Sequence, residues 1–134
     1  MNIFKIIFLA TLSILFIGCS STPQNSVEEM YEALKDGDAA KLYRVTTEPK
    51  ARQLTLKVLK ECSVNKHLYK DNFKLAKDCF REMYGKMNVK SIELTEVSET
   101  KAYAIVIYEN NSKTITNKEY LRMINGKWLV LRYQ

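Results

Sequence analysis

The segment AYAIVIYENNSKTITNKEYLRMINGKWLVLRY, residues 102–133, contains three candidate β-strands and the turns between them. Its valine, isoleucine and tyrosine residues favour extended backbone, and polar breaks interrupt it at Asn110-Asn111 and Asn125-Gly126. Asn-Gly is the strongest short signal for a β-hairpin, because a type I′ turn needs a positive φ angle at both central residues. The segment therefore predicts strands at 102–108, 114–124 and 128–133.

A fourth strand is expected just upstream, at residues 89–97, and Ser98-Glu99-Thr100 separates it from the next one. Residues 102–108 are apolar on both faces, which indicates a central strand. Residues 114–122 alternate more regularly between polar and apolar side chains, so one face of that strand is expected to meet water. Together the four strands predict an antiparallel meander.

Before residue 88 the apolar residues recur with the spacing of helices. The first helix is expected to begin at Ser26, which forms a capping box with Glu29, and to end at Gly37. Three more are expected, from Asp38 to about Thr46, from Pro49 to about Glu61, and from Asp71 or Asn72 to Gly85. The side chains expected to face the core include Val27, Met30, Tyr31, Leu34, Ala39, Leu42, Tyr43, Ala51, Leu54, Val58, Phe73, Ala76, Cys79 and Phe80. Helices followed by an antiparallel sheet predict an α+β fold.

A chain of 134 residues is long enough for one domain with a single core. Its formal net charge is +6 at pH 7, and the basic residues are scattered, with no run of five or six. This distribution is typical of a solvated surface and argues against nucleic-acid binding. The positive charge is still compatible with an anionic lipid or glycan as a neighbour.

The N-terminal segment has the pattern of a secretory signal peptide. Lys5 supplies a positive charge, the apolar run from residue 6 to 17 follows, and polar residues begin at Ser20. A membrane span needs roughly 20 apolar residues, so this run is too short to cross a bilayer comfortably. The alternative is an uncleaved signal anchor in which Cys19 has no role.

The end of that run, Phe16-Ile17-Gly18-Cys19, resembles the lipobox of bacterial lipoproteins, although Phe16 replaces the usual leucine. The resemblance implies that residues 1–18 are removed as a lipoprotein signal peptide and that Cys19 carries the lipid. Two or more acyl chains give stable membrane attachment. Residues 19–25 would then be the lipidated cysteine and a flexible tether, and 26–134 the domain. Ser20 after the cysteine favours the periplasmic face of the outer membrane over the inner membrane.

Two segments carry a second resemblance. VEEMYEALKDGDAAKL, residues 27–42, and NGKWLV, residues 125–130, are similar to the opening helices and closing hairpin of bacterial lipoproteins with a nuclear-transport-factor-two-like domain of unknown function. The resemblance implies helices packed on a curved, four-stranded antiparallel sheet in a cone-shaped fold. That fold hosts enzymes, ligand carriers and interaction modules, so it leaves the function open.

Two cysteines remain once Cys19 is assigned to the lipid. Cys62 ends one predicted helix and Cys79 lies midway along the next, so a helical hairpin can bring their side chains together. An even pair in an oxidising compartment predicts a disulfide. The alternative is two buried free thiols.

No residue pattern in the chain indicates catalysis or metal binding. His67 is the sole histidine, and it lies beside Lys66 and Lys70 in a polar loop, which disfavours a metal site. No phosphate-binding glycine loop, nucleophile elbow or zinc-protease motif is present. We therefore expect no cofactor and no metal.

Aromatic side chains are the remaining candidates for a binding site. Rings offer apolar contact and phenol hydroxyls orient a small ligand in a pocket. The candidates for lining a concave mouth between helices and sheet are Tyr31, Tyr43, Tyr103, Tyr108, Tyr120 and Trp128. The alternative is that most of them fill or flank the core.

Two functions follow from these patterns. The first is a non-catalytic envelope lipoprotein that binds another envelope protein or peptidoglycan. The second is a carrier of a small apolar ligand, or an enzyme of the ketosteroid-isomerase kind. A pocket lined by a buried carboxylate would favour the second, and a filled core with an exposed apolar groove would favour the first.

Overall fold

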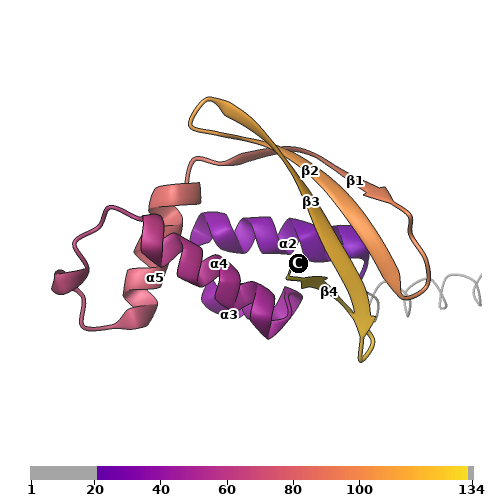
Figure 1. Ribbon diagram of the computed structural model, residues 1–134, viewed down its shortest axis with the longest axis horizontal. Coiled ribbons are helices and arrows are strands. Elements are labelled where there is room, and N and C mark those ends of the chain that lie inside the picture. The colour runs from indigo at the N-terminus through magenta and orange to yellow at the C-terminus, as the bar shows by residue number, and fades with distance from the viewer. Residues whose placement is uncertain (1–20, 133–134) are drawn as a thin grey trace, which may run out of the picture.

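The computed structural model of the protein describes residues 21–132 and has the predicted α+β order (Figure 1). The helices are α2 (Pro23–Asp36), α3 (Ala39–Val45), α4 (Glu48–Glu61), the short 3-10 helix η1 (Lys66–Leu68) and α5 (Asn72–Tyr84). The strands are β1 (Asn88–Thr95), β2 (Lys101–Asn110), β3 (Lys113–Ile124) and β4 (Lys127–Leu131). Both the type and the sequence order of these elements confirm the α+β prediction.

The predicted leader, residues 1–18, and the predicted lipid site Cys19 lie outside the described residues. The signal peptide, the lipid anchor and the location in the envelope therefore stay predictions. Within residues 21–132, no helix combines the length and the apolar character that a membrane span requires.

The four strands form one antiparallel sheet in the order β1-β2-β3-β4, as the meander predicts. The β3–β4 turn has positive φ angles at Asn125 (51°) and Gly126 (78°), which confirms the hairpin predicted there. The β2–β3 turn lies one residue later than expected, because Asn111 and Ser112 take the positive φ angles and Asn110 still pairs with Lys113. An asparagine tolerates that conformation well, so either position of the turn suits the sequence.

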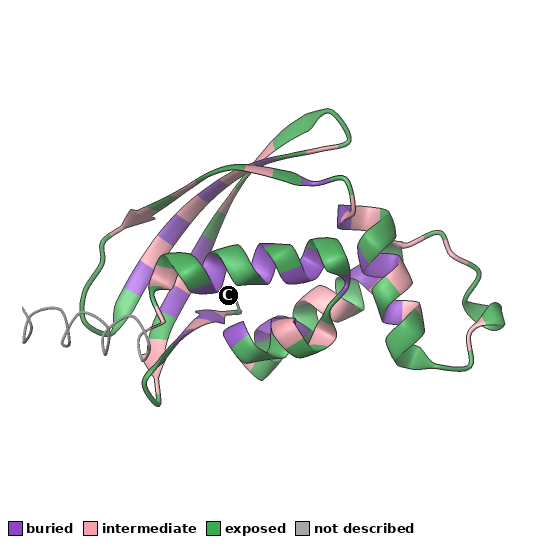
Figure 2. Cartoon of the chain, turned by 180° about the vertical axis from the view of Figure 1, so that it is seen from behind, coloured by how far each residue is buried: buried purple, intermediate pink, exposed green. Residues whose placement is uncertain are grey.

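Helices α2, α3 and α4 lie on one side of the sheet, with α2 beneath the curved strands, and α5 packs against α2 and α4 (Figure 1). Side chains along β2 point alternately to the two faces of the sheet, and every second one meets the helices. Ala102, Ala104, Val106 and Tyr108 are buried, whereas the residues between them are only partly covered. In α2 the buried residues follow the expected stripe, which recurs as purple bands along the helix in Figure 2. The core therefore lies between α2 and the inner face of the sheet and continues between α2 and the other helices.

Helix α2 begins at Pro23, three residues before the expected start at Ser26. Thr22 is the N-cap, and its Oγ1 accepts a hydrogen bond from the Asn25 amide at 3.1 Å. Ser26 is instead buried and donates through Oγ to the Trp128 carbonyl at 2.7 Å. The capping-box prediction is therefore wrong, because a tertiary partner competes for the Ser26 hydroxyl. Residues 23–25, which were expected to belong to a flexible tether, are instead helical.

Replacing Ser26 with alanine is expected to lower the free energy of unfolding by about 1–2 kcal/mol, because it leaves the buried Trp128 carbonyl without that donor. Urea unfolding followed by circular dichroism measures the loss. Ser91→Ala, at an exposed position of β1, is the matched control and should change stability by less than about 0.5 kcal/mol. Equal stability of the two variants would contradict a structural role for the Ser26 hydroxyl.

Two side chains expected in the core are exposed. Tyr43 is 50% exposed, because the buried residues of the short helix α3 are Leu42 and Val45 and the next position turns about 100° away from Leu42. Phe73 is 75% exposed although it follows the helical spacing. It lies in the first turn of α5, beside a mostly exposed loop, where an apolar stripe has no partner to pack against.

Candidate functional site

A cavity of about 520 Å³ lies between the helices and the inner face of β2 and β3. This volume is within the range of small-molecule sites, which is roughly 300–1,000 Å³. The side chains around it come from five elements: Met30, Tyr31 and Leu34 from α2, Lys50, Gln53, Leu54 and Lys57 from α4, Tyr84 from α5, Tyr108 from β2, and Ile115, Asn117 and Glu119 from β3. Its wall is therefore apolar in part, with a group of polar side chains concentrated on β3 and the helices facing it.

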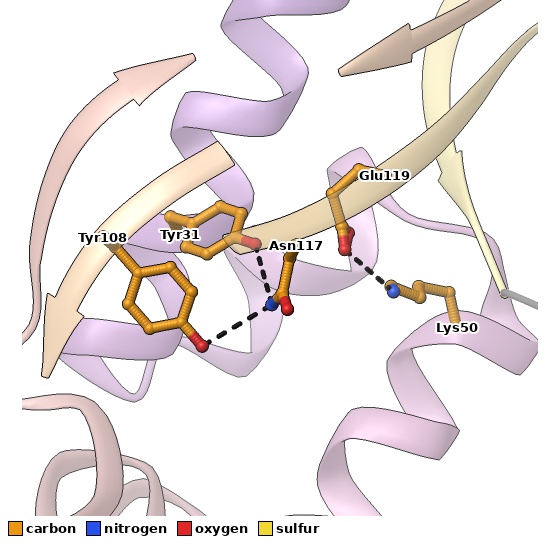
Figure 3. A network of polar contacts seen from close by, with 5 residues as sticks. All are labelled: Tyr31, Lys50, Tyr108, Asn117 and Glu119. Atoms are coloured by element: carbon orange, nitrogen blue, oxygen red, sulfur yellow. Dashed lines mark hydrogen bonds and ion pairs between the residues drawn. The ribbon is translucent and has the colours of Figure 1, made fainter. Parts of the chain in front are cut away.

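Two tyrosines and one amide form the first polar group of the cavity (Figure 3). Asn117 Nδ2 donates to the Tyr31 hydroxyl at 3.3 Å and to the Tyr108 hydroxyl at 3.5 Å. The two rings lie 5.5 Å apart between centroids and are tilted by 56°. Because each hydroxyl oxygen accepts from the amide, each phenol proton is free to be donated elsewhere.

A buried ion pair is the second polar group. Lys50 Nζ lies 3.3 Å from Glu119 Oε1, and the two side chains are only 9% and 6% exposed. The other carboxylate oxygen, Glu119 Oε2, is buried and has no hydrogen-bond partner within residues 21–132. Buried oxygens without protein partners are rare in folded proteins, so this one is available to accept a hydrogen bond from a bound molecule.

The strand period explains why Asn117 and Glu119 share one face. In β3 the buried residues Glu119 and Leu121 have the same parity as Asn117, and they pair with the buried residues of β2. Lys118 borders the cavity as well, yet its ammonium lies 4.6 Å from the centroid of the Tyr103 ring. The register thus presents an amide and a carboxylate side by side on the helix-facing side of the sheet, as Figure 3 shows.

Burial raises the pKa values of one carboxyl group and three phenols in the cavity, those of Glu119, Tyr31, Tyr84 and Tyr108. Removal from water raises the pKa of Glu119, and the nearby Lys50 ammonium opposes that rise. Burial also raises the pKa of Tyr31, with a further contribution from the Glu119 charge, and raises that of Tyr84 to about 12. Both phenols therefore remain protonated hydrogen-bond donors at neutral pH.

The raised pKa of Glu119 predicts a pH dependence of stability. A carboxyl group that binds its proton more tightly when folded stabilises the fold fully below its unfolded pKa, near 4.5, and loses that contribution as the pH rises through the folded value. The Glu119→Gln variant lacks this titration. We therefore expect the unfolding free energy of wild type, relative to the variant, to fall between pH 4.5 and the folded pKa. Urea unfolding of both proteins from pH 4 to pH 8 tests this, and a difference that grows with pH would contradict it.

The structure divides the six aromatic candidates into four groups. Tyr31 and Tyr108 line the cavity. Tyr103 and Tyr120 pair with each other across β2 and β3 at 4.7 Å between centroids, at positions out of phase with the cavity residues of those strands. Trp128 is buried and contributes to the core, and Tyr43 is exposed on α3.

The disulfide expected between Cys62 and Cys79 is present, with 5.3 Å between the Cα atoms. It joins the end of α4 to the middle of α5, as the helical-hairpin argument predicts. His67 is exposed in η1. In the described part of the chain no group of histidine, cysteine, aspartate and glutamate side chains is arranged to hold a metal ion.

The sequence reasoning missed three members of the site: Lys50, Asn117 and Glu119. Glu119 had a detectable signal, since it has the parity of Leu121 in a strand with one face expected to meet water, and a charged residue in the inward phase is unusual. Lys50 had no such signal. It lies in the first turn of a helix, where lysines are ordinarily solvated, and only the tertiary structure, in which α4 packs beside the sheet and Lys50 reaches Glu119 of β3, buries it.

No family model matches the sequence, and no curated protein shows significant similarity to it. Among solved structures, the fold is similar to that of a candidate NTF2-like transpeptidase from Campylobacter jejuni, with a TM-score of 0.49 and 15% sequence identity. The match covers 84% of this chain and 100% of that chain. A likeness at this level does not define a family or a function for the chain.

Proposed function

We propose that this domain binds a small organic ligand in the cavity between its helices and its sheet. The observation that carries the proposal is the buried Glu119 carboxylate, of which one oxygen is bonded to Lys50 and the other has no partner in the described residues. A pocket with a few convergent polar groups whose pKa values are perturbed is the usual form of a binding site. The alternative of an interaction module is less well supported by this cavity.

The cavity offers complementary contacts to a ligand of mixed character. Met30, Leu34 and Ile115 supply apolar surface. The phenol protons of Tyr31 and Tyr108 are available as donors, because their oxygens already accept from Asn117. A molecule with an apolar body and a polar head therefore fits these walls better than a purely apolar one.

The cellular context of this binding is also part of the proposal. The predicted signal peptide and lipid site at Cys19 support a domain that is tethered to the cell envelope, on the periplasmic face of the outer membrane. A tethered domain of this kind would bind its ligand beside the membrane. Mass spectrometry of the protein from membrane fractions tests the anchor, and an unmodified Cys19 would remove it.

Titration of the ¹⁵N-labelled protein with benzyl alcohol tests the binding proposal. The probe combines an apolar ring with one hydroxyl, and saturable NMR shift changes are expected at residues 30–34, 50–54 and 115–119. Leu54→Trp fills the cavity and should abolish them, whereas Leu56→Trp, on an exposed position of the same helix, should not. Non-saturable changes, or equal changes in the two variants, would reject the proposal.

Proton transfer is a second candidate function, favoured by the raised pKa of Glu119 in a site that contains two phenol donors. The carboxylate would remove a proton from carbon beside a ketone, and a phenol would donate to the resulting enolate oxygen. Deuterium exchange into cyclohexanone, followed by NMR, tests this. Exchange at the same rate with wild type and with Glu119→Gln would exclude Glu119 as the base and leave binding as the function.

A further inference from the structure

The ion pair in the cavity is incompletely satisfied on both sides. A lysine ammonium has three N–H donors, and Lys50 has one hydrogen-bond partner in the described part of the chain, Glu119 Oε1. The carboxylate can accept several hydrogen bonds, but its Oε2 receives none from residues 21–132. The pair therefore presents unused donors and an unused acceptor close together.

The net charge of this group restricts the ligand. Lys50 and Glu119 neutralise each other in a place where each side chain is less than 10% exposed. The other charged side chains around the cavity, Lys57 and Lys118, are exposed to solvent. An anionic or cationic ligand head would therefore add a charge with no buried counter-charge, which carries a large desolvation cost. A neutral head is therefore favoured.

The positions of the unused atoms restrict it further. The unused Glu119 oxygen is on the same carboxylate as the oxygen that contacts Lys50 Nζ at 3.3 Å, so the ligand must present its donor and its acceptor on nearby atoms. A carboxamide does this, with an N–H group and a carbonyl oxygen on one carbon. An ester has no donor, and a carboxylic acid ionises at neutral pH.

From these observations we infer that the cavity binds a neutral carboxamide attached to an apolar group, with its N–H donated to Glu119 Oε2 and its carbonyl accepting from Lys50. This inference rests on the proposed ligand-binding function and adds the chemical class of the ligand. Leu34, Leu54 and Ile115 would contact the apolar part.

Four probes that share one aromatic ring test the inference: benzamide, methyl benzoate, benzoate and benzylamine. NMR titration of the full-length protein is expected to show that benzamide binds at least about tenfold more tightly than each of the others, because only benzamide satisfies both unused groups without adding charge. Equal affinity for benzamide and methyl benzoate, or tighter binding of benzoate or benzylamine, would overturn the inference.

The double variant Lys50→Met/Glu119→Leu is the matched control, since it removes the pair and leaves an apolar wall of similar volume. Its affinity for benzamide should fall to that of methyl benzoate, whereas Leu56→Trp, at an exposed position outside the cavity, should keep the benzamide preference of wild type. A benzamide preference that survives in the double variant would also overturn the inference. If benzyl alcohol binds wild type and benzamide has no advantage, the ligand class is wrong and the proposed function stands; if no probe binds at the cavity, both fail.

Discussion

Replacing Lys50 with methionine is expected to lower the free energy of unfolding by about 3–5 kcal/mol at pH 7. The substitution leaves the Glu119 carboxylate buried, without the ammonium that lies 3.3 Å from its Oε1. Removing one member of a buried ion pair costs more than the pair itself contributes, because the remaining charge keeps its desolvation penalty. Urea unfolding of wild type and Lys50→Met at pH 7 measures the difference.

The pH dependence of that loss identifies its cause. Lys50 lowers the pKa of Glu119, so its removal raises that pKa further above the ordinary value of 4.5. Below the raised pKa the folded state takes up a proton and the unpaired charge disappears. The loss caused by Lys50→Met should therefore shrink as the pH falls from 7 toward 5. A constant loss across this range would mean that lost packing, and not charge, explains the effect.

The double variant Lys50→Met/Glu119→Leu provides the control. Exchange of a buried ion pair for apolar residues of similar volume is often neutral or stabilising, by about 1–4 kcal/mol in favourable cases. The double variant should thus be at least as stable as wild type, although it lacks both charges. If the double variant is as unstable as Lys50→Met alone, the ion pair itself stabilises the fold, and the expectation that apolar residues can replace it is wrong.

Reduction of the Cys62–Cys79 disulfide is expected to lower the free energy of unfolding by about 3 kcal/mol. The bond spans 17 positions of the chain, and cutting it lets the unfolded chain explore more conformations. Urea unfolding with and without a phosphine reductant measures the change in wild type. The Cys62→Ala/Cys79→Ala variant is the control, because its stability should not respond to the reductant.

The reduced protein is expected to stay folded at moderate temperature, because other contacts hold the same region together. Glu82 accepts hydrogen bonds from the amide and the hydroxyl of Ser63, and the Tyr69 hydroxyl donates to Asp78 at 2.6 Å. These contacts connect the 62–71 loop to α5. An unchanged unfolding midpoint on reduction would show that they, and not the disulfide, determine stability there.

The Glu119–Lys50 pair connects these stability predictions with the proposed function. An apolar exchange that leaves stability the same or higher, and abolishes the benzamide preference, would show that the pair is kept for recognition. The disulfide lies outside this argument, since neither Cys62 nor Cys79 borders the cavity.

Much of the fold was predictable because it depends on local interactions. The Asn125-Gly126 turn, the stop at Gly37 and the cap at Asp38 are at their expected places, since each depends on the backbone preference of one or two residues. The start of α2 was not predictable in this way. Ser26 suits a cap, but its hydroxyl bonds the Trp128 carbonyl, which is 102 positions away along the chain.

The candidate site and its surroundings also combine features set by local sequence with features set by tertiary packing. From local pattern, the sequence by itself determined the helices, the four strands and the helical spacing that lets Cys62 meet Cys79. Only the tertiary structure decided that Lys50 is buried and that Tyr31, Tyr108, Asn117 and Glu119 share one cavity. The physical reason is that periodicity assigns a side chain to a face of its own element, whereas burial and pKa depend on which face of another element packs against it.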